Sequence, residues 1–267
     1  MSEIHLQRWK LIIEYEGSAF KGWQRQENVM SVQQALEQAI KEFCQQDVEC
    51  FASGRTDSGV HALGQVVHFD MAVNARHDPY SVRKAINALV KTHPVVVVSA
   101  EKVVPEFHAR FDAKERFYRY LMLERQVYSP HFEGLVWQID LPEEVGHLDV
   151  EAMQKGANHL VGKKCDFSAF RASACQAKTP MRTVNNIHFT VQDMDALMQM
   201  PARLITMHIS AKSFLHHQVR NIIGTLKAVG QGVQGPDDIK DILESKNRCA
   251  AGITAPPEGL YFDRVDY

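Results

Sequence analysis

Cysteine is scarce in this sequence of 267 residues, and its arrangement excludes a small disulfide-stabilised domain. The five cysteines are an odd number, they are scattered along the chain, and no two of them form a C-x-x-C pair. A chain of this length buries a core large enough to fold without cross-links. The sequence therefore favours a reducing compartment, and we expect a cytoplasmic protein.

Long hydrophobic runs are also missing. The densest apolar run, residues 95–98, is far shorter than the roughly 20 residues that a membrane-spanning helix requires. The N-terminus mixes Glu3, His5 and Arg8 among its apolar residues, so it lacks the apolar centre of a secretory signal. We therefore expect neither a membrane segment nor export.

Neither sign of charge is in excess, since 30 Lys+Arg stand against 32 Asp+Glu and give a formal net charge of −2. That balance excludes a uniformly basic nucleic-acid-binding protein, but it allows basic residues to gather on one face. A composition of 45% hydrophobic and 23% charged residues is typical of folded globular proteins. Disordered and fibrous classes are thereby excluded.

Cofactor-binding motifs are missing as well. The sequence has no G-x-x-x-x-G-K-[ST] run and no G-x-G-x-x-G run that follows a predicted strand. Among the 13 histidines the only close pair is His216 and His217, which on a helix would point apart, and no Cys/His cluster has zinc spacing. We therefore predict that the protein uses no metal and no nucleotide cofactor.

Hydrophobic periodicity predicts helices and strands in two successive groups. Helices are expected at 31–44, where Ser31 and Gln34 form a capping box, and after Asp78-Pro79, which suit the cap and the first helical position. The other elements of the first group are strands at 10–15, 48–52, 65–69, 95–104 and 116–123. The second group comprises a helix at 149–161, strands at 187–191 and 204–211, and a helix at 219–229.

These two groups predict an α+β protein with two similar halves. The predicted halves are residues 1–140 and 147–267, because a stretch rich in Pro, Glu and Gly separates them.

The loop at 53–64 carries the most chemically active residues. It begins Ser53-Gly54-Arg55-Thr56-Asp57-Ser58-Gly59-Val60-His61-Ala62 and joins two apolar strands. An Asp between glycines is most often a turn residue that bonds its own backbone. The loop alone therefore leaves both a structural and a catalytic role open for Asp57.

Several segments together resemble the tRNA pseudouridine synthase A family, in the family's order, from residue 15 to the C-terminus. The segments are Tyr15-Glu16-Gly17, Phe20-Lys21-Gly22-Trp23-Gln24-Arg25-Gln26, Gly54 to Ala62, Gly64-Gln65-Val66, His68-Phe69, Phe107-His108-Ala109-Arg110-Phe111, Arg116, Tyr118-Arg119-Tyr120, Asp166-Phe167-Ser168, Phe170-Arg171, Thr179-Pro180, Arg182, Phe214 to Asn221 and Glu258-Gly259-Leu260-Tyr261. One departure is Ser58, where the family often has Ala, and both residues are small.

The resemblance implies the pseudouridine synthase fold, with two α/β-sandwich halves that meet in a central active-site cleft and form one catalytic unit. Each half would have an antiparallel or mixed sheet with helices on one side. It implies isomerisation of uridine to pseudouridine at positions 38, 39 and 40 of the tRNA anticodon stem-loop. It also implies base flipping, a homodimer, and no cofactor. The rivals are a catalytically inactive RNA-binding protein or RNA chaperone of the same fold, and, less favoured, an enzyme that uses Asp57 as a phosphoryl acceptor or hydrolytic nucleophile.

The resemblance also assigns roles to five residues. Asp57 would be the catalytic carboxylate, and Arg220 would be the cation that keeps it ionised. Tyr118 would stack on the target uracil, whereas periodicity alone makes it a packed aromatic residue that shares a face with Tyr120. Arg55 would hold the flipped-out nucleotide and Leu260 would pack on the base, although a surface Arg and a core Leu explain them equally well.

RNA binding requires a positively charged surface, and several basic residues lie inside the family's motifs. The candidates are Lys21, Arg25, Arg110, Arg171 and Arg182. Contacts with phosphates would make binding sensitive to salt. About half of such residues are expected to be ordinary solvated surface residues, because Lys and Arg occupy surfaces anyway.

Overall fold

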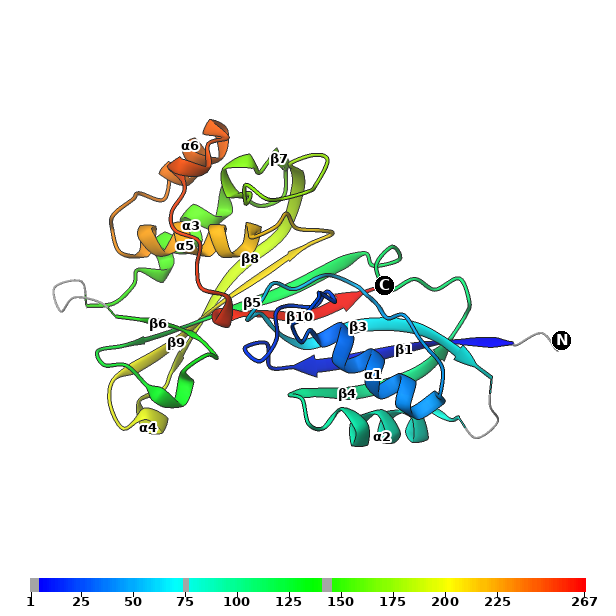
Figure 1. Cartoon of the computed structure of the whole chain (residues 1–267). Coiled ribbons are helices and arrows are strands. Elements are labelled where there is room, and N and C mark those ends of the chain that lie inside the picture. Colours follow the sequence, from blue (N-terminus) through cyan, green and yellow to red (C-terminus); the bar gives the residue numbers. More distant parts are fainter. Residues whose placement is uncertain (1–4, 74–76, 141–145) are drawn as a thin grey trace. The chain divides into compact units, whose positions relative to one another are not determined.

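The computed structural model describes residues 5–73, 77–140 and 146–267 (Figure 1). The chain divides into two compact units. Unit 1 comprises Met1–Lys114 and Tyr261–Tyr267, and unit 2 comprises Glu115–Leu260.

This division differs from the predicted boundary at 140–147, which lies within unit 2 and of which residues 141–145 fall outside the described residues. Strand pairing gives the reason. Strand β5 (Glu115–Arg125) pairs along ten residues with β9 (Ala202–Ala211), so it belongs to unit 2. Strand β10 (Leu260–Asp266) pairs with β3 (His61–Ala72), so the C-terminus returns to unit 1 (Figure 1). Composition along the chain does not reveal either pairing.

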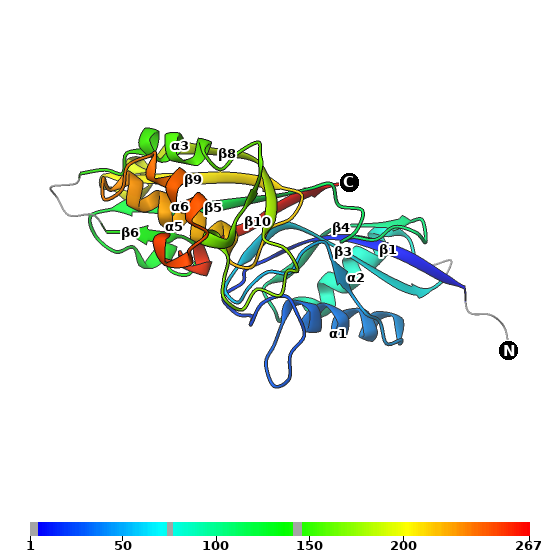
Figure 2. The same cartoon turned by 90° about the horizontal axis from the view of Figure 1, so that it is seen from above.

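Unit 1 is built on a mixed sheet in the order β4 (Val95–Val103), β1 (Leu6–Tyr15), β3 and β10. Strand β1 is antiparallel to both neighbours, β10 runs parallel to β3, and the short β2 (Phe51–Ala52) pairs with β3. Alternate residues of β1, from Trp9 to Tyr15, are buried because successive side chains of a strand point to opposite faces. Helices α1 (Val32–Cys44) and α2 (Pro79–Val90) lie on one face of this sheet (Figure 2).

The two helices of unit 1 begin at the predicted caps. The reciprocal capping box, however, forms at α2 and not at α1, where the sequence predicts it. Ser31 accepts the backbone N–H of Gln34 at 3.2 Å, but the side-chain Oε1 of Gln34 has no partner among the described residues, so the predicted reciprocal bond is wrong. At α2 the full capping box forms, because Asp78 accepts from Tyr80 and Ser81 and the Ser81 hydroxyl accepts from Asp78.

In unit 2 the strand order is β5, β9, β8 (Met181–Asp193) and β7 (Lys164–Asp166), with β6 (Trp137–Ile139) parallel to β5. Helix α3 (Val150–Asn158) begins at Asp149, which accepts the N–H of Ala152 at 2.8 Å. Helices α5 (Gln218–Gly230) and α6 (Asp238–Ser245) follow the last long strand, and the one-turn α4 (Asp195–Met198) joins β8 to β9. The short 3₁₀ helices are Pro130–Phe132, Ser168–Phe170, Arg248–Ala250 and Pro257–Gly259.

The α+β class is confirmed in both units, and the periodic helices lie close to where the sequence predicts them. The strand predicted at 48–52 shrinks to two residues, and β3 begins at His61 rather than at residue 65. The loop that carries Asp57 is therefore shorter than predicted and runs from 53 to 60. Among the described residues, no helix is both long and apolar enough to cross a membrane.

Candidate active site

The loop at 53–60 joins β2 to β3 in unit 1 and presents Asp57 half-buried between two anchored ends. Its upstream neighbour Thr56 is buried, whereas Arg55 is exposed. The turn closes by a bond from the N–H of Val60 to the carbonyl of Asp57 at 3.2 Å, next to Gly59, whose φ of +80° favours glycine.

Buried polar side chains support this loop from β1 and β3. The hydroxyls of Tyr15 and Thr56 share a hydrogen bond of 2.8 Å. The side chain of Gln65 accepts from the Ser53 hydroxyl at 2.5 Å and donates to the Gly54 carbonyl at 2.7 Å. Burial raises the pKa of Tyr15 to about 12, against smaller lowering contributions from its contacts with Thr56 and Gln65. The Tyr15 hydroxyl is therefore neutral at physiological pH.

A second segment, residues 17–23, packs against the other side of the loop. The N–H of Trp23 donates to the Thr56 carbonyl at 3.0 Å, and the Ser58 hydroxyl donates to the Phe20 carbonyl at 3.3 Å. A Cβ on Gly17 would lie 2.1 Å from the carbonyl oxygen of Val60, so only glycine fits there. The glycines of this segment thus allow its backbone to approach the backbone of the 53–60 loop closely.

His61 closes the loop at the start of β3. Its Nδ1 accepts the N–H of Gly17 at 2.9 Å, and its ring stacks on Tyr261 of β10 with centroids 4.5 Å apart. The ring is 1% exposed. It links the loop, the 17–23 segment and the C-terminal strand of unit 1.

In unit 2, Tyr118 and Tyr120 share one face of β5 as predicted. Tyr120 is fully buried and donates to the Pro256 carbonyl at 2.8 Å, and burial raises its pKa, with a further rise from Glu258 and a lowering by Arg220. Tyr118 is only half-buried and meets Phe214 edge-to-face at 5.3 Å. The two tyrosines therefore separate into a packed ring and a more accessible one.

Arg220 is the third residue of α5 and is half-buried. Its Nε donates to the carbonyl of Ala255 at 2.7 Å, which fixes the plane of the guanidinium. The N–H of Ala255 returns a bond to the Arg220 carbonyl at 3.1 Å. The segment before β10 thus orients this cation.

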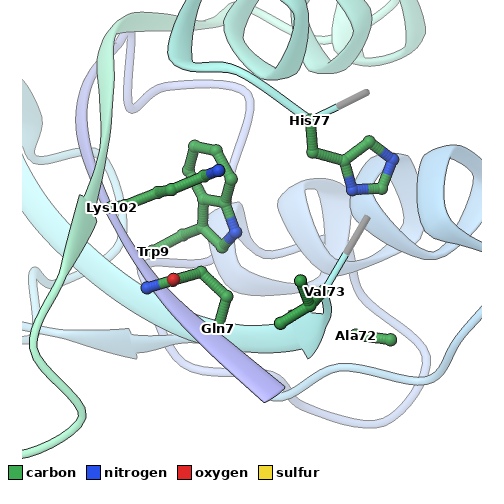
Figure 3. A pocket seen from close by; sticks show the side chains of 6 residues that line it. All are labelled: Gln7, Trp9, Ala72, Val73, His77 and Lys102. Carbon is green, nitrogen blue, oxygen red and sulfur yellow. The ribbon is translucent and has the colours of Figure 1, made fainter. Parts of the chain in front are cut away.

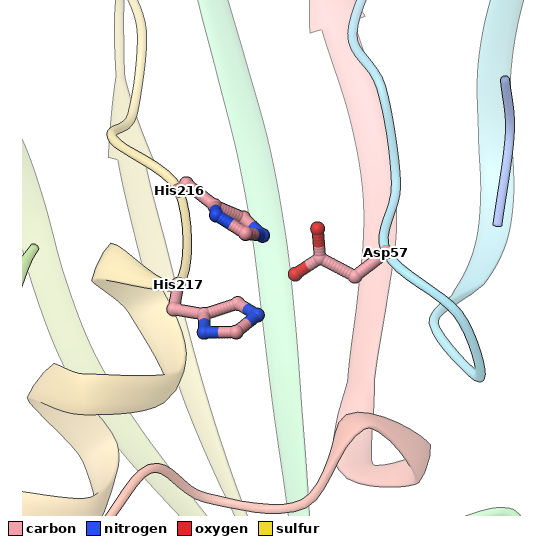
Figure 4. A group of neighbouring side chains, drawn as sticks. All are labelled: Asp57, His216 and His217. Atoms are coloured by element: carbon pink, nitrogen blue, oxygen red, sulfur yellow. The ribbon is translucent and has the colours of Figure 1, made fainter. Parts of the chain in front are cut away.

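The expectation that His216 and His217 point apart on a helix is wrong. Helix α5 begins only at Gln218, and His217 has a φ of +61°, so the two imidazoles lie side by side with centroids 4.0 Å apart. Figure 4 shows these two rings at the start of α5, and it also shows the carboxylate of Asp57 on its loop in unit 1. The left-handed backbone of a non-glycine residue is the feature that helix periodicity does not anticipate.

The structure distributes the predicted site residues over both units. Arg55 and Asp57 share one loop of unit 1, whereas Tyr118, Arg220 and Leu260 belong to unit 2. Leu260 is 6% exposed at the start of β10, a burial that fits the core interpretation. The predicted pairing of Arg220 with Asp57 joins residues of different units and stays a prediction.

The predicted RNA-binding residues differ in their surroundings. Lys21 and Arg110 are exposed, and the Arg110 guanidinium lies 5.8 Å from the centre of the Phe111 ring. Arg25 instead forms an ion pair with Glu37, a carboxylate that is 4% exposed and also binds Gln33. Arg25 thus has a structural role in anchoring the segment before α1.

In unit 2, Arg171 and Arg182 donate to main-chain carbonyls. Arg171 binds the carbonyls of Cys175 and Ala177 at 2.5 and 3.0 Å. Arg182 binds those of Thr179 and Met181 at 3.0 and 2.7 Å. Burial lowers the pKa of Arg182, and the nearby Arg171 lowers it further while Cys175 raises it.

A small pocket lies elsewhere in unit 1 and is lined by Gln7, Trp9, Ala72, Val73, His77 and Lys102 (Figure 3). The indole Nε1 of Trp9 and the Nδ1 of His77 have no partner among the described residues. A volume of about 20 Å³ holds one water molecule and is too small for a base or a sugar. The pocket is therefore no substrate site.

Sequence reasoning missed the supporting residues Tyr15, Thr56 and Gln65 as functional candidates. One signal was present, because Gln65 interrupts the inward-facing apolar positions that continue at Val67 and Phe69. A polar residue at such a position requires hydrogen-bond partners. The sequence does not identify those partners.

Comparison with known proteins agrees with the resemblance in the sequence. The family described as tRNA pseudouridine synthase matches residues 11–112 and 157–267. A tRNA pseudouridine synthase A of Rhodospirillum centenum is 48% identical over 262 residues, which cover 98% of this chain and all of that protein. The tRNA pseudouridine synthase A of Anaplasma phagocytophilum is 45% identical, and the match covers 97% of this chain and all of that protein. The tRNA pseudouridine synthase A of Dinoroseobacter shibae is 44% identical, and the match covers 97% of this chain and 96% of that protein. The chain belongs to the tRNA pseudouridine synthase family, whose members are isomerases.

Proposed function

We propose that this protein isomerises uridine to pseudouridine at positions 38, 39 and 40 in the anticodon stem-loop of tRNA. The observation that carries the proposal is the anchored loop at 53–60, which presents the Asp57 carboxylate in a chain whose near-full-length relatives are tRNA pseudouridine synthases. A buried and fully bonded support is what a group that must be held in one geometry requires.

The chemistry needs no added oxidant, reductant or group donor. The bond between the ribose C1′ and N1 of uracil breaks, the base turns, and C1′ joins C5. N1 gains a proton and C5 loses one, so atoms and electrons balance within the nucleotide and solvent. We therefore propose a reaction without metal or other cofactor.

Asp57 supplies the carboxylate for this reaction. It attacks C1′, attacks C6 or removes the C2′ proton, and each route divides one difficult step into easier ones. Arg220 supplies the cation that keeps the carboxylate ionised in a water-poor site, with its guanidinium plane held by Ala255.

The remaining site residues handle a base that has left the stack. Tyr118 offers a half-buried ring for stacking on the uracil, and Leu260 packs against it. Arg55, exposed on the loop of Asp57, holds the backbone of the flipped nucleotide. Recognition of three neighbouring positions fits contacts to RNA shape and backbone rather than to base edges.

We place the enzyme in the cytoplasm as a homodimer, with exposed basic residues such as Lys21 and Arg110 on the RNA. The rival is an RNA-binding protein or RNA chaperone that keeps the fold without catalysis. It predicts tRNA binding with no change in any uridine.

The decisive experiment compares the native protein with Asp57→Asn on tRNA transcripts that carry tritium at C5 of uridine. Native protein should release tritium to solvent and convert positions 38 to 40, whereas the variant should bind tRNA normally and release at least about 1,000-fold less. Native protein that binds tRNA but releases nothing would favour the RNA-binding rival. An active Asp57→Asn variant would refute the role of Asp57 while leaving the activity in place.

A further inference from the structure

The loop of Asp57 rests on a buried amide, that of Gln65, which has no role in the reaction as proposed. Gln65 is 0% exposed, and its inward-facing neighbours on β3, Val67 and Phe69, are equally buried and apolar. A primary amide in such a place destabilises the fold unless both of its polar ends are bonded.

Both ends of the Gln65 amide bind the same short stretch of the loop. The oxygen accepts from the Ser53 hydroxyl and the nitrogen donates to the Gly54 carbonyl, three residues before Asp57. The N–H of Ser53 is fixed in turn by the Val66 carbonyl at 2.8 Å. One residue of β3 therefore fixes where the loop leaves the sheet.

Tyr15 of β1 extends the same support to the residue next to Asp57. Its hydroxyl bonds to Thr56 at 2.8 Å and also contacts the side chain of Gln65. Tyr15 is 3% exposed and Thr56 is 7% exposed, so solvent does not compete for these bonds. The main chain is thus held on the N-terminal side of Asp57 by buried hydrogen bonds.

We infer that Gln65 is a positioning residue for the reaction, and that its amide, together with the Tyr15 hydroxyl, holds the Asp57 loop in its productive geometry. The inference rests on the proposed function, because it assumes that the carboxylate of Asp57 reacts. It assigns Gln65 no contact with the RNA.

The chemistry of the site explains why an amide is required. The position must accept from Ser53 and donate to Gly54 at the same time, and a primary amide does both from two separate atoms without a charge. An ionised Glu would place a carboxylate oxygen against the Gly54 carbonyl. A protonated Glu would restore the donor, and Met would keep the size and lose both bonds.

The test measures single-turnover tritium release at saturating tRNA, together with tRNA affinity and thermal unfolding, for native protein, Gln65→Met and Gln65→Glu. Gln65→Met should lower the single-turnover rate about 100-fold, the cost of displacing a reacting group by about 1 Å, with tRNA affinity within about threefold of native. Gln154→Met is the matched control, because Gln154 of α3 likewise donates to and accepts from a strand of unit 2, at Ile187 and Phe189. Its rate should be native.

Gln65→Glu adds a readout that a purely structural role would not change. Its rate relative to native should rise as pH falls from 8 to 6, because burial favours the protonated Glu that imitates the amide. Tyr15 is the titratable group in contact with this position and stays neutral in that range. Asp57 and His61 are present in native protein and variant alike, so any contribution they make to the pH dependence cancels in the ratio.

Each outcome decides the question. A native rate in Gln65→Met, or a loss explained wholly by weaker tRNA binding, would overturn the inference. If Gln65→Met does not fold, Tyr15→Phe decides, since loss of the hydroxyl alone should lower the rate about 10-fold and an unchanged rate would refute the network's role. Native protein that fails to release tritium would instead refute the proposed function.

Discussion

The two units hold their polar groups in different ways. In unit 1, the loop of Asp57 is fixed by buried side chains such as Tyr15 and Gln65 that bond to one another and to the loop. In unit 2, Arg171, Arg182 and Arg220 donate to main-chain carbonyls at the edges of loops. Carbonyls orient a guanidinium without neutralising it. Unit 1 thus holds the loop of one carboxylate with buried side chains, and unit 2 orients three guanidinium groups with main-chain carbonyls.

Unit 2 also contains a neutralised pair, and breaking it should have the largest effect on stability. Glu124, 4% exposed, receives two bonds of 2.9 Å from Arg203. Burial alone would raise the pKa of Glu124, but Arg203, the Leu148 N–H and His147 together lower it. Arg203→Met should cost about 3–5 kcal/mol of unfolding free energy at pH 7, because the buried carboxylate loses its charged arginine partner and keeps only the Leu148 N–H and His147.

Urea denaturation of native protein and Arg203→Met measures that cost. The difference should shrink as pH falls below the ordinary Glu value of 4.5, because the native pair loses its advantage when Glu124 is protonated and the variant's carboxyl is then neutral. Arg203→Met combined with Glu124→Leu should recover most of the loss. A cost below about 1 kcal/mol would mean that solvent compensates this carboxylate.

Lysine substitutions at Arg220 and Arg171 test whether the reaction needs an oriented guanidinium group or only a positive charge. Arg220→Lys keeps a cation but loses the planar group held at Ala255, so the single-turnover rate should fall about 10- to 100-fold. Arg171→Lys should stay within about threefold, because a point charge serves RNA binding nearly as well. Tritium release at saturating tRNA gives both values. Equal losses in the two variants would contradict the division of roles between these cations.

Mild acid should lower the stability of unit 1 through protonation of His68. Its Nδ1 accepts the N–H of Ala109 at 3.2 Å, and burial, aided by His108 and Arg8, lowers its pKa from 6.5 to about 4. The unfolded chain therefore binds a proton at a pH where the native state does not, and stability falls as pH drops from 6.5 toward 4. The expected loss at pH 5 is about 2 kcal/mol relative to neutral pH.

Thermal unfolding between pH 7.5 and 5 measures this loss. His68→Leu should be less stable at pH 7.5 but should lose less on acidification, because the titrating group is gone. Protonation of Asp70, whose pKa its bond to Arg8 lowers below 3.8, destabilises unit 1 only at more acidic pH. A variant with the native pH dependence would show that another group titrates.

The sequence predicts individual helices and strands better than it predicts the pairing of distant strands. A periodic apolar pattern, such as that of α5, predicts a helix from residues close together in the sequence. Local signals such as Asp78-Pro79 do the same for α2, and the structure contains both helices. The domain boundary depends on β10 returning to β3 across about 200 residues of chain, and no local pattern records such a pairing. Global pairing is therefore what the sequence leaves undetermined.

For the site, the sequence predicts residue types better than their surroundings. The loop of Asp57 stands out because charged residues and glycines interrupt two apolar strands. Its support does not, because Tyr15 and Gln65 lie 50 positions apart and meet only through the pairing of β1 with β3. The left-handed backbone of His217 is likewise not signalled by any local pattern, so periodicity places its ring wrongly.

The smallest expected difference between the arginines of the two units is in the salt dependence of tRNA binding. Arg171 and Arg182 donate to main-chain carbonyls, so Arg171→Gln and Arg182→Gln should each lower the slope of log affinity against log salt by about 0.7–0.9. Arg25 of unit 1 is already paired with the buried Glu37, so Arg25→Gln should leave the slope unchanged. Binding isotherms at several salt concentrations measure these slopes. A slope that falls for Arg25→Gln but not for Arg171→Gln would reverse the roles assigned to these two arginines.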